Sequence, residues 1–158
     1  MKQFWSVFKR EFVAYFSTPL AYVFLVIFIF FSSFLTWQNN FFEAGQASMR
    51  IFFGNMPLLL TFLVPAVAMR LWAEERRSNS IELLMTLPVT LTQAVLAKFA
   101  AAWAVVAVAL VLTFPMLLTV SYLGDPDPGP ILTGYLGSFL MAGAYMAIGG
   151  FFSALTRN

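Results

Sequence analysis

The sequence of 158 residues contains no cysteine and no histidine, and only 10% of its residues are charged. Without these two residue types the chain lacks disulfides and the usual ligands of zinc, copper, haem and iron–sulfur clusters. It also lacks Ser-His-Asp and Cys-His sets, and no G-x-x-x-x-G-K-[ST] run is present to cradle ATP phosphates. We therefore expect no catalytic residues, no metal site, no cofactor and no ATP site.

What the chain has in abundance is apolar surface, since 61% of its residues are hydrophobic and 18% are aromatic. A soluble domain carries about a quarter charged residues, so this composition indicates an integral membrane protein. Four stretches without charge can each hold the roughly 20 apolar residues that a helical span needs. We predict an all-α fold with membrane-spanning helices at 20–37, 51–71, 94–122 and 131–155, with proline kinks at Pro57, Pro65 and Pro115.

The basic residues predict how these spans are oriented. Eight of the nine lie before the first span, around the segment between the second and third spans, or after the fourth, and only Arg50 lies on the other side. This asymmetry places both ends of the chain and residues 74–92 in the cytoplasm. Lys98 is counted here with the cytoplasmic flank, so no ionisable residue is expected in the middle of a span. That argues against an ion-coupled transporter with a buried acidic relay.

Residues 1–17 are typical of an amphipathic helix. At 100° per residue its aromatic side chains share an arc of about 120°, whereas Lys2, Lys9 and Arg10 lie away from the centre of that arc. Such a helix lies in the plane of the membrane, with aromatic rings at the acyl boundary and basic groups among the headgroups. We expect a retained interfacial helix, because no small-residue cleavage pattern follows the first apolar run.

The densest run of charge, at residues 74–88, contains the signals of a short helix. Asn79 and Glu82 have the spacing of a capping box, and Pro88 ends helical geometry at the preceding residue. Between them Ile81, Leu84 and Met85 form an apolar stripe on a helix too short to be stable alone. Two interpretations remain open: the stripe lies on lipid headgroups as a plain anchor, or it docks into a groove on a soluble partner.

The fourth span is rich in small residues, several of them spaced four apart. Small-xxx-small pairs let helices approach closely, so they predict a packing face within the subunit or between two subunits. The set comprises Gly134, Ser138, Ala142, Gly143, Ala147, Gly149, Gly150, Ser153 and Ala154.

The run EERRSNSIELLMTLPV at residues 74–89 resembles the cytoplasmic coupling loop of ABC-2 type transporter permeases, and is closest to the branch associated with gliding motility and copper-enzyme maturation. The resemblance extends to PAVAMR at 65–70, to Lys98-Phe99 and to LGDPDPGP at 123–130. Here Asn79-Ser80 stands where that family usually has Gly-Thr. The residues that the resemblance assigns to partner docking are Glu74, Glu75, Arg76, Arg77, Ser80, Ile81, Glu82, Leu83, Leu84, Met85 and Pro88.

The resemblance implies a permease subunit in the inner membrane of a bacterium. It would work with a separate ATP-binding cassette ATPase and a second permease subunit, and it would not bind nucleic acid. Permeases of this family usually have six spans, so we expect the sequence to be a fragment that lacks the last two. The alternative is a membrane scaffold that anchors a cytoplasmic motility or assembly complex without transport. No polar groups in the spans identify a substrate.

Overall fold

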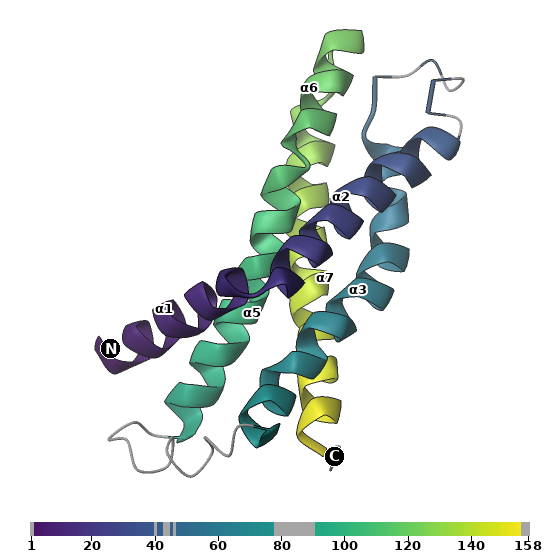
Figure 1. The fold of residues 1–158 in the computed structure, drawn as a ribbon. Helices are drawn as coiled ribbons and strands as arrows, with labels where there is room; N and C mark the ends of the chain where they lie inside the picture. The colour runs from purple at the N-terminus through teal and green to yellow at the C-terminus, as the bar shows by residue number, and fades with distance from the viewer. Residues whose placement is uncertain (1, 40, 43–44, 46, 78–90, 156–158) are drawn as a thin grey trace.

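The protein folds into a bundle of α-helices in the computed structural model, which describes residues 2–39, 41–42, 45, 47–77 and 91–155 (Figure 1). Helices α2, α3 and α7, and α5 together with α6, are long and apolar enough to cross a membrane. This confirms the predicted all-α integral membrane fold. The helices are α1 (Lys2–Ser17), α2 (Pro19–Gln38), α3 (Arg50–Arg77), α5 (Leu91–Leu112), α6 (Phe114–Leu123) and α7 (Pro128–Leu155).

The connections between the spans lie at two opposite ends of the bundle. Helix α3 ends, α5 begins and α7 ends at one end, here named the Arg77 end (Figure 1). The α2–α3 and α6–α7 connections lie at the other, here named the Gly124 end (Figure 1). The arrangement is that of spans which run alternately up and down.

Proline determines two of the helix boundaries. Pro19 opens α2, where a missing N–H costs nothing, and Thr18 before it has extended geometry with φ −111° and ψ 150°. Near Pro115 the long span is interrupted, and the Thr113 amide donates to the Leu110 carbonyl three residues back at 3.2 Å. The kink predicted at Pro115 therefore separates α5 from α6. Pro57 and Pro65, in contrast, do not end a helix, since both lie inside α3.

The core of the bundle is made of long apolar side chains from several spans. Phe28 of α2, Phe52 and Leu60 of α3, and Met146 of α7 are fully buried. Helix α3 packs most extensively against α7. The outward face of α2 exposes Val26, Phe30 and Phe31 among other apolar residues, as expected of a helix surrounded by lipid tails.

Helix α1 crosses α5 rather than standing apart from the bundle (Figure 1). Val7 and Tyr15 are buried and Glu11 is half-buried between them, so the i, i+4, i+8 row faces the bundle. Of the predicted aromatic arc, Trp5 is 63% exposed, and it stacks on Phe8 with ring centroids 5.2 Å apart. The face of α1 that packs on the bundle is thus centred near Glu11, to one side of the aromatic arc predicted from the sequence. Its position at a membrane interface stays a prediction.

Candidate functional site

The segment predicted to dock a partner begins as a continuation of α3. This helix runs on to Arg77, so Glu74, Glu75, Arg76 and Arg77 are helical, and α5 begins at Leu91. Residues 66–77 contain neither proline nor glycine, and alanine, leucine, glutamate and arginine are good helix formers. The helix therefore extends past the predicted boundary at residue 71. The remaining docking residues, Ser80, Ile81, Glu82, Leu83, Leu84, Met85 and Pro88, lie outside the described residues.

A buried ion pair lies close to the start of α5. Lys98 Nζ is 3.1 Å from Glu11 Oε2, and the two side chains are 5% and 18% exposed. Glu11 Oε1 also accepts a hydrogen bond from Arg10 Nη2 at 2.9 Å. Lys98 lies seven residues after Leu91, which is about 10 Å along a helix. The sequence interpretation counts Lys98 among the flanking charges, and that position stays a prediction. The structure adds that the Lys98 side chain is buried within the bundle beside a carboxylate.

This ion pair joins α1 to α5, the helix that follows residues 78–90. A charge inside a membrane protein is costly unless a partner and hydrogen bonds offset its desolvation. Glu11 can offset the Lys98 charge only while α1 lies against α5. The pair is therefore a specific polar contact between α1 and α5.

Small residues determine how closely α7 approaches α3. A Cβ atom added to Gly149 would lie 2.6 Å from the Cβ of Ala68. Real Cβ atoms essentially never show contacts this short. One turn further, Ser153 Oγ donates to the Met69 carbonyl of α3 at 2.9 Å. Near the Gly124 end, a Cβ on Gly134 would lie 2.5 Å from the ring of Phe53. Helices α3 and α7 thus pack closely near both ends.

A tryptophan of α5 occupies the space that another small residue of α7 leaves. The rings of Trp103 and Phe139 stack with centroids 4.2 Å apart, and Trp103 Nε1 donates to the Phe139 carbonyl at 2.9 Å. A Cβ on Gly143 would lie 2.9 Å from the Trp103 ring. Only glycine at 143 therefore lets this ring lie flat against α7.

The other residues of the predicted packing face divide between the interior and the surface. Ser138 and Ala142 are buried, Gly150 is half-buried, and Ala147 and Ala154 are exposed. The contacts named above are within one chain. A role of the exposed alanines between two subunits stays a prediction.

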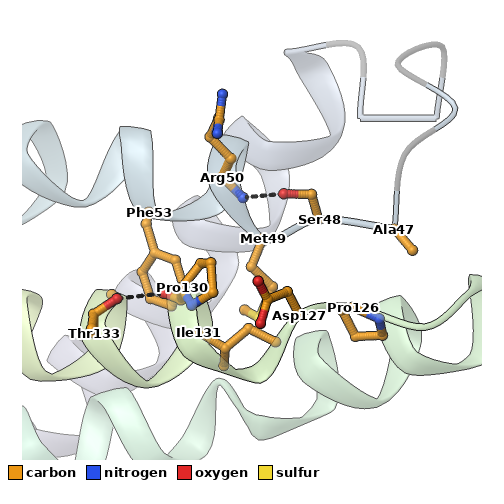
Figure 2. Close-up of a pocket in the computed structure, with 11 residues that line it drawn as sticks. Ala47, Ser48, Met49, Arg50, Phe53, Pro126, Asp127, Pro130, Ile131 and Thr133 are labelled. Atoms are coloured by element: carbon orange, nitrogen blue, oxygen red, sulfur yellow. Dashed lines mark hydrogen bonds between the residues drawn. The ribbon is translucent and has the colours of Figure 1, made fainter.

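A cavity of about 400 Å³ lies at the Gly124 end, between the start of α3 and the start of α7 (Figure 2). Met49, Phe53 and Ile131 supply apolar walls, and Asp127 lies at its rim. Asp127 Oδ1 accepts a hydrogen bond from the Gly129 amide at 3.0 Å, as a helix N-cap does. The Arg50 side chain points away from this carboxylate (Figure 2). Asp127 therefore acts as a cap for α7.

Comparison with known proteins assigns the chain to a family. No curated protein and no solved structure matches the chain. Residues 35–158, which include all of α3, α5, α6 and α7, match the model of the ABC-2 family transporter protein. That match covers most of the 158 residues, and four helices here can span a membrane. The chain therefore belongs to the ABC-2 transporter family and is a multi-pass membrane component of an ABC transporter.

Proposed function

We propose that the chain is a permease subunit that couples ATP hydrolysis by a separate ATPase subunit to movement of a substrate across the membrane. The observation that carries the proposal is the position of the 78–90 segment in a chain of this family. It lies between two spans, follows a helix that extends to Arg77 and precedes one that begins at Leu91. A partner bound there would act on two spans at once.

The packing of the bundle supplies a route for that action. ATP can bias the permease only if the docked segment makes different contacts with the ATPase in two states. A displacement of the α3 end would carry α7 with it, because Gly149 and Ser153 hold these helices together. A displacement of the α5 start would carry α1, through Lys98 and Glu11. Two pairs of helices would thus move as units.

Residues 80–87 are proposed to form the docked helix. Ile81, Leu84 and Met85 would be its apolar anchors, and Glu82 would be part of a polar rim. An amphipathic helix in a groove is a common mode of peptide recognition, with anchors at i, i+3 and i+4. The rim would also include Glu74, Glu75, Arg76 and Arg77.

The proposed location is the bacterial cytoplasmic membrane, which the family resemblance implies. The basic residues support an orientation with residues 74–92 and both ends of the chain in the cytoplasm. We include a second permease subunit in the proposed assembly. The resemblance to the branch for gliding motility and copper-enzyme maturation belongs to the proposal as well, and no substrate is assigned.

Retention of the ATPase by purified variants tests the proposal. Leu84→Asp would place a charge in the apolar contact and should abolish retention, since an unpaired buried charge costs several kcal/mol. Glu82→Ala removes a cap and a rim contact at about 1 kcal/mol, so it should weaken retention less. Both variants should still insert into the membrane.

Co-purification from native membranes, followed by identification of the bound proteins, gives the readout. Equal retention by Leu84→Asp and the parent would show that this segment is not the dock. A retained partner without a nucleotide site would favour the scaffold alternative instead.

A further inference from the structure

A shallow groove of about 470 Å³ runs along the outside of the bundle, where α5 and α6 meet α7. Its floor includes Ala107 and Leu110, and Leu110 is only 4% exposed. Its sides include Val111 and Leu132, which are 71% and 72% exposed. The groove lies along the break between α5 and α6, close to Pro115.

The groove has no unsatisfied polar group that would require a polar ligand. Tyr135 lies in it, and its hydroxyl is 3.0 Å from Thr113 Oγ1. Thr113 Oγ1 also donates to the Leu110 carbonyl at 2.6 Å, so Tyr135 donates to Thr113. Among the described residues that line the groove, none is charged. What fits such a surface is hydrocarbon.

The length of the groove corresponds to the thickness of one leaflet. Its lining residues run from Ala107 to Leu117 on α5 and α6, and from Leu132 to Phe139 on α7. At 1.5 Å per residue these stretches are about 15 Å and about 10 Å long. Half of a bilayer's hydrocarbon core is about 15 Å thick. Both stretches lie in the halves of the spans nearer the Gly124 end, so the groove opens into the tails of a single leaflet.

We propose that this groove holds an acyl chain of a bilayer phospholipid from that leaflet. A second helix fits it less well, because contacts between membrane helices that approach closely are enriched in small residues. Only Ala107 in the groove is small, whereas leucine, valine, phenylalanine and tyrosine make up the rest. The glycines of α7 with close neighbours face Phe53, Trp103 and Ala68 instead. The bound chain lies beside Phe114 and fills the space between α6 and α7.

Photolabelling in vesicles tests this assignment. The full chain is reconstituted in phosphatidylcholine vesicles that contain a small fraction of a phosphatidylcholine with a diazirine in the middle of one acyl chain. After irradiation, mass spectrometry of the peptides maps the labelled residues. We expect labelling at Leu110, Val111 and Leu136 at least fivefold above that at Phe30 and Phe31, which are exposed on α2.

Filling the groove provides the matched comparison. Ala107→Trp or, if that variant does not fold, Leu136→Trp should reduce groove labelling to the level of the α2 face. Val26→Trp on α2, where the side chain is 66% exposed, should leave groove labelling unchanged. Labelling equal to that of α2 in the parent, or unaffected by the filling variant, would overturn the proposal. A cross-link between two copies that shields the groove would also overturn the proposal.

Discussion

Loss of the Glu11 carboxylate should destabilise the bundle more than loss of any exposed charge. Glu11 Oε2 is 3.1 Å from Lys98 Nζ, and the lysine side chain is 5% exposed. Glu11→Gln would remove the carboxylate charge that lies 3.1 Å from the buried ammonium. Breaking a buried pair from one side costs about 3–5 kcal/mol.

The assay is thermal unfolding of the purified chain in a mild detergent, followed by intrinsic fluorescence. At about 2–4 °C per kcal/mol for a chain of this size, a loss of about 3 kcal/mol lowers Tm by roughly 6–12 °C. Arg10→Gln is the matched control. Arg10 also contacts Glu11, at 2.9 Å, but its side chain is 55% exposed. The free energy of unfolding should then change by at most about 1 kcal/mol.

The double variant Glu11→Leu/Lys98→Met separates the ion pair from simple packing. Replacing a buried pair by apolar residues of similar volume is often neutral or stabilising. We therefore expect the double variant to unfold at a higher temperature than Glu11→Gln or Lys98→Met alone. Additive losses, or a Glu11→Gln variant as stable as the parent, would refute the claim that this pair holds α1 on α5.

Further variants test the helix packing and the topology. Gly143→Ala should destabilise by about 1–3 kcal/mol, since its Cβ would lie 2.9 Å from the Trp103 ring, whereas Gly137→Ala enters open space and should not; thermal unfolding compares them. Trp103→Phe should cost about 1 kcal/mol by the same assay, because it loses the hydrogen bond to the Phe139 carbonyl. In intact cells an impermeant maleimide should label Asp127→Cys and not Ser78→Cys, and the reverse would contradict the predicted orientation.

Much of the fold could be predicted because hydrophobic length is a local property. The four spans follow from uncharged stretches, and the break near Thr113 follows from Pro115. The end of α3 could not be placed in the same way. Charge at residues 74–77 indicates departure from the membrane, but these residues are good helix formers, so the helix continues to Arg77.

The ion pair of Glu11 and Lys98 escaped sequence reasoning because its partners are 87 positions apart. A hydropathy pattern scores each charge by its own neighbours, so it groups Lys98 with the flanking charges and gives Glu11 no role. A signal was present, since Glu11 is the only acidic residue before Glu43 and Lys98 is the only charged residue between Glu82 and Asp125. The lone acidic residue of one apolar region and the lone lysine of another are candidates for one another.

The packing glycines and the groove depended on tertiary structure in different ways. Spacing identified Gly134, Gly143 and Gly149 as small residues, but it could not tell that their neighbours are Phe53, Trp103 and Ala68. The groove between α5, α6 and α7 had no sequence pattern of its own, because it is lined by residues from three helices.

Photo-crosslinking from residue 84 tests most directly whether an ATPase docks on the 78–90 segment. Leu84 is replaced by a photoreactive amino acid in the full chain, membranes of the native host are irradiated, and adducts are identified by mass spectrometry. Val26, exposed on α2, provides the control position. We predict a protein adduct at position 84 that contains an ATP-binding cassette with a P-loop, and lipid adducts at position 26. Lipid adducts at position 84 as well would contradict the docking account and support a plain membrane anchor.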